Sequence, residues 1–263
     1  GIDPFEVKIV RDIIKIQSVK YEIIENIGYL RITSFTEQTE SGLIKSIDII
    51  KKESNNKQLG FILDVRSNPG GLLSQSIKVS DIFLDRGEIV STRSRDDKDM
   101  KRYRAKKGDL IDNQPLVVLI NGGSASASEI VAGALQDHKR AILVGTKSFG
   151  KGSVQTIIPF KKSNMNKTTT GIRLTTARYY TPSGKSIQAK GIEPDIIIEQ
   201  GTFTSQDYQY LSESDLKDSL DNENDNNENS TGEKEEDRLQ KDYQLARAID
   251  LIKGISFYKE TLK

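Results

Sequence analysis

Three short apolar runs limit the fold of this chain more than any other feature of its sequence. They are FILDV at 61–65, LVVLI at 116–120 and AILV at 141–144. A continuous apolar run of this length is typical of a strand buried on both faces, as in a parallel sheet covered by helices. Segments with helical periodicity lie between the runs, at 72–84 and 130–135. The alternation predicts an α/β fold with a mixed, partly parallel sheet and flanking helices.

The rest of the chain adds strands, a linker and a further helix. Strand patterns occur at 7–16, 18–24, 29–35 and 153–198, and a helical period occurs at 40–52. Residues 206–238 are crowded with Asp, Glu and Asn. We expect an acidic, disordered linker there, because such a segment buries too little apolar surface to become ordered. The C-terminal segment 239–263 is expected to form an amphipathic helix, whose periodic part at 239–254 is stopped by Gly254.

Composition removes several classes of function. The 263 residues carry a formal net charge of +1, which gives no long-range attraction to nucleic acid or to a membrane surface. The chain has no cysteine and one histidine, which excludes a thiolate metal site, a multi-histidine metal site and a cysteine nucleophile. No apolar run approaches the roughly 18 residues of a membrane-spanning helix.

The segment NGGSASASEIVAGALQD at 121–137 allows two interpretations. Ser126 and Glu129 fit the capping box S-x-x-E, so Ser126 could simply begin a helix. Ser126 could also be a nucleophile, because the preceding glycines let backbone approach a ligand and the small neighbours leave its hydroxyl open. A helix N-terminus also offers free N–H groups to a developing oxyanion. The pattern alone leaves both interpretations open.

A nucleophilic serine needs a base, and the residues favour lysine over histidine. His138 lies at the far end of the expected helix, roughly 18 Å from Ser126, in a charged stretch typical of a solvated helix end. Lys151 stands between two glycines after the third apolar run, and a buried neutral lysine can accept a proton. The G-x-S-x-G elbow of α/β-hydrolases and the P-loop spacing are both missing.

The segment 121–137 is one of five motifs. The first is GYLRITSF at 28–35, and three others lie on either side of 121–137. They are LDVRSNPGGLL at 63–73, VGTKSFGKGSVQ at 144–155 and TARYYTPSGKSIQAKGIEPD at 176–195. With them, the chain resembles the carboxyl-terminal processing peptidases, or tail-specific proteases, over residues 7–198. These are Ser/Lys serine endopeptidases with a crotonase/ClpP-like α/β core and an inserted PDZ domain. The resemblance implies cleavage of proteins near their C-terminal tails through an acyl-enzyme intermediate.

The resemblance also assigns roles to individual residues. Ser126 matches the nucleophile, Lys151 the general base, and Gln155 the residue that orients the lysine. If the stretch is a strand, four positions place Lys151 and Gln155 on one face. Asp137 matches a family aspartate that we interpret as structural support.

The oxyanion hole is expected to combine the backbone N–H of Ala127 with that of Gly70 or Gly71, in a turn stiffened by Pro69. The resemblance implies no cofactor. It implies protein or peptide substrates with apolar C-termini, and an extracytoplasmic, periplasmic or membrane-associated place in a bacterium. A homodimer and a regulatory partner protein remain open.

The chain departs from the family pattern at its start. Residues 1–16 are expected to combine a cloning scar, GIDPF, with a remnant of the last PDZ strand, so the PDZ domain is largely missing from this chain. Residues 17–205 are expected to form the peptidase core. Two rival functions remain: a crotonase-like enzyme acting on acyl thioesters, and a catalytically silent binding module.

Overall fold

The computed structural model describes residues 17–96, 99–160, 171–202 and 238–261. The strand predicted at 7–16, and all but the last residue of the linker predicted at 206–238, lie outside this part of the chain. The strands are β1 (Val19–Ile24), β2 (Ile27–Ile32), β3 (Phe61–Asp64), β4 (Glu88–Arg93), β5 (Lys101–Arg104), β6 (Leu116–Ile120), β7 (Ile142–Gly145), β8 (Ser153–Pro159), β9 (Gly171–Tyr180) and β10 (Ile196–Ile197). The helices are α1 (Thr39–Glu53), α2 (Leu73–Phe83), α3 (Ala127–Asp137) and α5 (Tyr243–Thr261).

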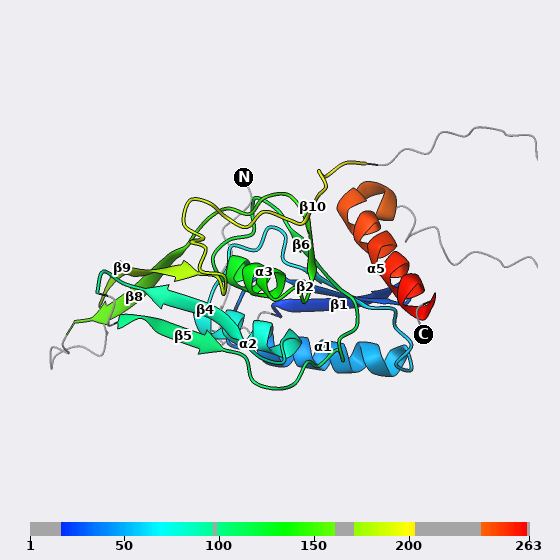
Figure 1. Ribbon diagram of the computed structural model, residues 1–263, viewed down its shortest axis with the longest axis horizontal. Coiled ribbons are helices and arrows are strands. Elements are labelled where there is room, and N and C mark those ends of the chain that lie inside the picture. The colour runs from blue at the N-terminus through cyan, green and yellow to red at the C-terminus, as the bar shows by residue number, and fades with distance from the viewer. Residues whose placement is uncertain (1–16, 97–98, 161–170, 203–237, 262–263) are drawn as a thin grey trace, which may run out of the picture.

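The main sheet contains the three apolar runs as neighbouring strands. Its order is β1-β2-β3-β6-β7-β10, and it is parallel except for the antiparallel β1–β2 pair. All residues of β3 and β6 are buried, as expected of central strands covered on both faces. The predicted mixed, partly parallel sheet with flanking helices is therefore confirmed (Figure 1).

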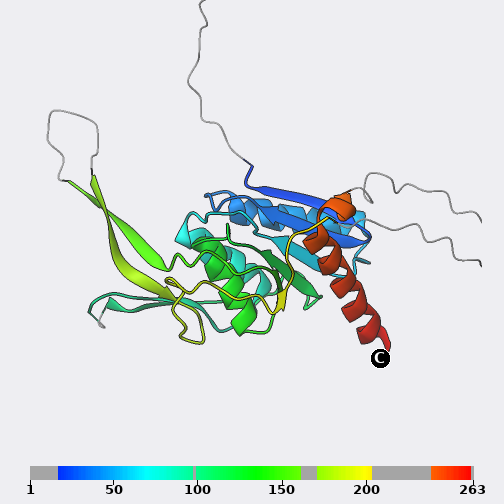
Figure 2. The same cartoon turned by 90° about the horizontal axis from the view of Figure 1, so that it is seen from above.

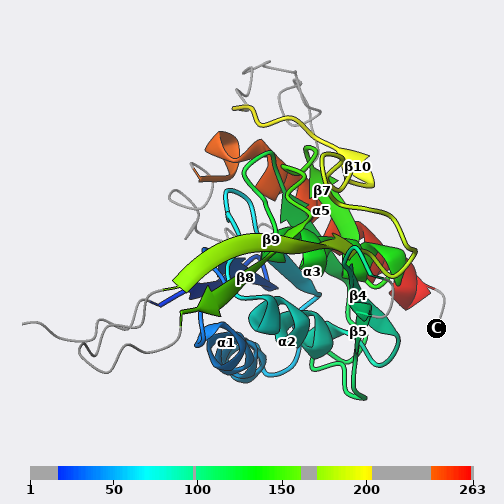
Figure 3. The ribbon, with the colours of Figure 1, turned by 90° about the vertical axis from the view of Figure 1, so that its left-hand side faces the viewer.

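Helices cover the two faces of this sheet in separate layers. Phe61 and Leu63 of β3 belong to the core formed with α1, α2 and α3, whereas Ile62 between them belongs to the core formed with α5. Side chains alternate across a strand, so consecutive residues of one apolar run serve both layers. Figure 3 shows α1 and α2 side by side in the lower part of the view, α3 in the middle, and α5 behind the strands.

A second sheet was not predicted as a separate unit. It is antiparallel, with the order β5-β4-β9-β8, and its β8–β9 hairpin extends away from the body of the molecule (Figure 2). β4 and β5 were not predicted because neither contains a continuous apolar run: β4 reads EIVSTR and β5 reads KRYR. Strand β8 of this sheet begins two residues after Lys151, so the sheet borders the candidate site.

The end of the C-terminal helix differs from the prediction. Helix α5 does not stop at Gly254 but continues to Thr261. Gly254 does not take the positive φ that ends many helices at glycine. Tertiary contacts hold the helix instead: Leu245 and Ile252 are buried against the sheet, and Ser256 Oγ donates to the Leu59 carbonyl at 2.7 Å. Within the described ranges, no helix is both long and apolar enough to cross a bilayer.

Candidate active site

The two glycine-bearing turns meet at the carboxyl ends of neighbouring parallel strands, where ligands of such sheets bind. One follows β3 and the other follows β6. Asn68 joins them, because its carbonyl accepts hydrogen bonds from Ala125 N at 3.0 Å and Ser128 Oγ at 2.9 Å. Ser124 Oγ adds a bond to the Val65 carbonyl at 2.8 Å. Ser124 and Ser128 therefore hold the turns together, and Ser126 is the serine between them.

Ser126 has a strained backbone. It is the N-cap of α3 with φ 56° and ψ −107°, in a region that residues with a Cβ rarely occupy. Such a conformation costs about 1–3 kcal/mol and persists only where the surroundings enforce it. A strained strand-to-helix turn is also what exposes the nucleophile of an elbow motif, although the G-x-S-x-G sequence is missing here. The strain is an observation that a simple helix cap does not explain.

The candidate oxyanion donors differ in how their N–H groups are used. Gly70 N donates to Asn68 Oδ1 at 2.9 Å, so that N–H is already occupied. Neither Gly71 N nor Ala127 N donates to an acceptor in the described part of the chain. A Cβ placed on Gly70 would lie 3.0 Å from Ala127 N, so this glycine turn lies directly against the helix start. Among the described residues, the N–H groups of Ala127 and Gly71 therefore remain available to an oxyanion, whereas that of Gly70 does not.

Lys151 lies in the loop between β7 and β8, where it is half-buried. The condition for Lys151 and Gln155 to share one strand face is not met, because β8 begins only at Ser153 and has a bulge between Val154 and Gln155. A bulge breaks the alternation on which that expectation depended. Gln155 is exposed. The described structure has no hydrogen bond between Ser126 Oγ and Lys151 Nζ, or between Lys151 Nζ and Gln155.

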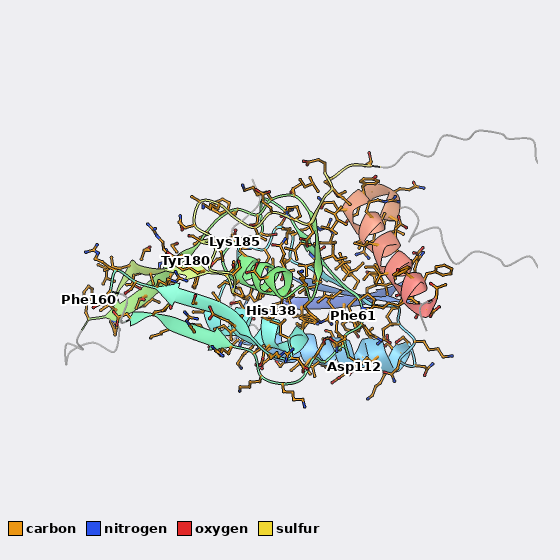
Figure 4. The ribbon with its side chains drawn as sticks, viewed as in Figure 1. Phe61, Asp112, His138, Phe160, Tyr180 and Lys185 are labelled. Atoms are coloured by element: carbon orange, nitrogen blue, oxygen red, sulfur yellow. The ribbon has the colours of Figure 1, made fainter. Side chains whose placement is uncertain are left out.

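Asp137 and His138 lie at the opposite end of α3 from Ser126. Asp137 Oδ2 accepts from Ser183 N at 2.8 Å, an anchoring contact that agrees with a supporting role. The interpretation of His138 as solvated is wrong. Its Nε2 lies 2.7 Å from the Glu88 carbonyl, and its ring packs against Gly87 beside β4 (Figure 4). His138 is nevertheless placed at a helix end, as the sequence predicted.

A buried ion network supports the turn after β3. Asp64 is fully buried and accepts hydrogen bonds from Tyr29, Arg31 and Arg66. Burial, then the charge of Asp64, raises the pKa of Tyr29 to about 12. Burial opposes the charge on Arg66, but its bonds to Asp242 and Asp64 outweigh that effect and raise its pKa. Arg66 therefore stays charged and fixes the start of the glycine turn.

The sequence did not predict the long-range hydrogen bonds of one residue, Glu129. The capping-box pattern identified it only as a helix-start residue, and its carboxylate does accept from Ser126 N at 2.7 Å. It also accepts from Gly150 N and Lys151 N at 2.6 and 2.9 Å. No local pattern signals those contacts, because they lie 21 and 22 positions away. The described residues contain no cluster of three or more His, Asp or Glu side chains able to hold a metal ion.

Comparisons with known proteins identify relatives of this chain. A carboxy-terminal-processing protease of Bartonella bacilliformis is 60% identical over 202 residues, which cover 76% of this chain and 45% of that protein. The carboxy-terminal processing protease CtpA of Bacillus subtilis is 35% identical over 209 residues, covering 79% of this chain and 43% of that protein. Among solved structures, the photosystem II D1 C-terminal processing protease matches with a TM-score of 0.60 at 32% identity, over 71% of this chain and 49% of that one.

The chain thus spans less than half the length of these relatives. The model of the family described as Peptidase family S41 matches residues 26–198, which include both glycine turns, Ser126, Lys151 and strands β2 to β10. The match covers more than half of the chain and agrees with the relatives. This chain belongs to peptidase family S41.

Proposed function

We propose that this chain carries the catalytic core of a serine endopeptidase that cleaves proteins near their C-terminal tails. Ser126 is the nucleophile and Lys151 the general base. The observation that carries the proposal is the strained Ser126 at the N-terminus of α3, next to the Ala127 N–H. That N–H and the Gly71 N–H of the neighbouring turn both have no acceptor among the described residues. A strained serine beside free backbone donors is the arrangement that acyl transfer needs.

The proposed reaction begins when neutral Lys151 takes the proton of Ser126 as its Oγ attacks the peptide carbonyl. The N–H groups of Ala127 and Gly71 stabilise the oxyanion of the tetrahedral intermediate. Lys151 then gives the proton to the leaving amine, and the C–N bond breaks to leave an acyl-enzyme on Ser126. Water hydrolyses this ester, with Lys151 again acting as base. Gln155 is proposed to orient the lysine once substrate is bound, since catalytic hydrogen bonds often form only in the complex.

The position of Lys151 supports its role better than that of the lone histidine. The backbone of Lys151 shares an acceptor with the backbone of Ser126, whereas His138 lies beyond the far end of α3. A helix of this length separates His138 from the nucleophile by roughly 18 Å. The His138 ring is also already bonded to the Glu88 carbonyl.

Substrates, partners and cellular place extend the same proposal. The names of the relatives support processing at carboxyl termini. From the resemblance we further propose that the substrate tails are apolar and that the protein acts outside the bacterial cytoplasm. We propose no cofactor, because a serine, a lysine and backbone donors complete the chemistry. We further propose that a PDZ domain recognises the tail, and that a homodimer or a regulatory partner assembles on the core.

Cleavage of a quenched-fluorescence peptide with an apolar C-terminal tripeptide tests the proposal. Ser126→Ala and Lys151→Ala should each remove activity while the proteins remain folded by circular dichroism. A Ser126→Ala variant that still cleaves the peptide would refute the mechanism. If the wild-type chain hydrolyses an acyl thioester but not the peptide, the crotonase-like alternative holds. If it does neither and binds the peptide unchanged, it is a binding module.

A further inference from the structure

Glu129 lies between the loop of the nucleophile and the loop of the base. Its side chain is fully buried. Oε2 accepts from Ser126 N at 2.7 Å and from Lys151 N at 2.9 Å. Oε1 accepts from Ser148 Oγ and from Gly150 N, both at 2.6 Å. One carboxylate therefore binds three backbone N–H groups and one hydroxyl from two separate segments.

In a capping box the glutamate carboxylate accepts only from the N-cap N–H, here Ser126 N, so the other three bonds of Glu129 go beyond that motif. An ionised carboxylate is costly to bury unless its oxygens are satisfied. Among the described residues no lysine or arginine forms an ion pair with Glu129, so the four donors and the N-terminus of α3 compensate its charge. Glu129 is thus a buried carboxylate without an ion-pair partner among the described residues, and it lies between the proposed nucleophile and the proposed base.

The loop that carries the base is shaped to reach this carboxylate. Gly150 has φ 92°, which an L side chain rarely adopts, and it turns two successive N–H groups toward Glu129. Ser148 Oγ donates to Glu129 and accepts from Ile192 N at 2.7 Å, which ties the loop to the body of the protein. A Cβ on Gly150 would lie 3.1 Å from Gly191 N, so the loop is also closely packed.

We infer that Glu129 is a positioning residue for the peptidase reaction, acting through the backbones of Ser126 and Lys151. The two amide nitrogens can lie no farther apart than the two hydrogen bonds laid end to end. Glu129 touches neither the substrate nor the transferred proton. It sets the distance between the two backbones, and this distance decides whether the Ser126 hydroxyl and the neutral Lys151 amine can meet. This inference rests on the proposed function, because it assumes that the two residues react together.

The chemistry of the site predicts which substitutions fail. Glu129→Gln replaces one acceptor oxygen with an NH₂ group. Oε2 faces two N–H donors and Oε1 faces a third, so either orientation of the amide leaves at least one backbone N–H against another donor. Glu129→Asp keeps the charge but withdraws the carboxylate by one methylene group. Both variants should loosen the Ser126–Lys151 spacing.

The matched control is Glu193→Gln. Glu193 is exposed and pairs with Lys147 at the surface, where an ion pair contributes little to stability. Lys147 lies in the β7–β8 loop, but Glu193→Gln makes the same chemical change without removing a hydrogen bond to Ser126, Gly150 or Lys151. Because a displacement of about 1 Å can cost about 100-fold in rate, Glu129→Gln should lower kcat on the fluorogenic peptide by about that factor, with KM changed less than about threefold. Glu193→Gln should retain wild-type kcat.

Amide hydrogen exchange separates this inference from the proposed function. In Glu129→Gln the amides of Ser126, Gly150 and Lys151 should exchange faster, while β3 and β6 keep their protection. If Ser126→Ala abolishes cleavage but Glu129→Gln keeps the wild-type kcat, the inference is wrong and the proposed function stands. If the wild type does not cleave, the exchange data decide alone, and unchanged protection at these three amides overturns the inference. If Glu129→Gln does not fold, Glu129→Asp is measured in its place, against the same criteria.

Discussion

Arg66 and Asp242 form a two-bond ion pair across 176 positions of the chain. Nη1 donates to Oδ1 and Nη2 to Oδ2, both at 2.7 Å. Asp242 Oδ1 also accepts from Leu245 N at 3.1 Å, at the start of α5. Arg66 opens the turn that contains Gly70 and Gly71. The pair therefore fastens the C-terminal helix to the turn that supplies one proposed oxyanion donor.

Breaking this pair should weaken both stability and activity. Asp242→Ala leaves a buried arginine with fewer partners, so we expect a loss of about 3 kcal/mol in the free energy of unfolding, at the low end for a buried ion pair. The kcat for the fluorogenic peptide should fall as well, because the turn after β3 loosens. Urea unfolding and peptide cleavage measure the two effects.

The control for that experiment is Asp250→Ala. Asp250 pairs with Arg247 on the exposed side of α5, and losing such a pair should cost less than about 0.5 kcal/mol.

The dependence of stability on acidic pH gives an independent check of the Arg66–Asp242 pair. Burial raises the pKa of Asp242, but the bonds and charge of Arg66 outweigh this and lower it. The stability from Asp242 should thus be complete above its ordinary pKa and disappear as pH falls through the lowered value. An equal loss in the free energy of unfolding in Asp242→Ala and Asp250→Ala would contradict the role of the Arg66–Asp242 pair.

Alkaline pH should also destabilise the network around Asp64. The pKa of Tyr29 is about 12 in the folded protein, above its ordinary value of 10.0. The folded state holds this proton more tightly, so the contribution is complete below pH 10 and is lost as pH rises toward 12. The loss should reach up to about 2 kcal/mol. Unfolding curves between these pH values measure it, and Tyr29→Phe should remove this part of the pH dependence. An identical alkaline profile in both proteins would exclude Tyr29 as its source.

Gly70→Ala should abolish activity through a steric clash. Gly70 has φ 100°, and its Cβ would lie 2.7 Å from the Ala125 carbonyl oxygen and 2.9 Å from Ser126 Cβ. The nucleophile turn must move, and we expect a fall of about 100-fold in kcat or more. Gly108→Ala is the control, since Gly108 has φ 133° with nothing within 4 Å of the added Cβ. It should lose about 1–2 kcal/mol of stability from backbone strain alone and keep its activity. Full activity in Gly70→Ala would show that the two turns are not coupled.

His138→Ala should leave kcat for the peptide unchanged and reduce stability by about 1 kcal/mol, the value of a typical hydrogen bond. The lost contacts are the bond to the Glu88 carbonyl and the packing against Gly87. Thermal unfolding and peptide cleavage on the same preparation test this. A folded His138→Ala protein without activity would favour a histidine base over Lys151.

Much of the main sheet could be predicted because burial on both faces leaves a strong mark in the sequence. The runs at 61–65, 116–120 and 141–144 became β3, β6 and β7, and the turns after the first two meet at one edge. The position of Ser126 at a helix start was likewise visible in the capping box.

What the sequence could not show depends on tertiary contacts. Gly254 resembles a helix stop, but packing around Ile252 carries α5 onward to Thr261. Lys151 and Gln155 do not share a strand face, because Lys151 lies outside β8 and a bulge follows Val154. The bulge can be recognised only from the pairing with β9. The bonds from Glu129 to the Lys151 loop connect segments without any common pattern.

The most direct test of the central claim is to identify the residue that becomes acylated. Wild-type protein is mixed with the p-nitrophenyl ester of an apolar N-acyl amino acid, quenched in acid within one turnover, digested and analysed by mass spectrometry. The account predicts an acyl adduct on Ser126 that is absent from Ser126→Ala and forms far more slowly in Lys151→Ala. An adduct on another residue, or acylation of Ser126 at the wild-type rate without Lys151, would contradict it.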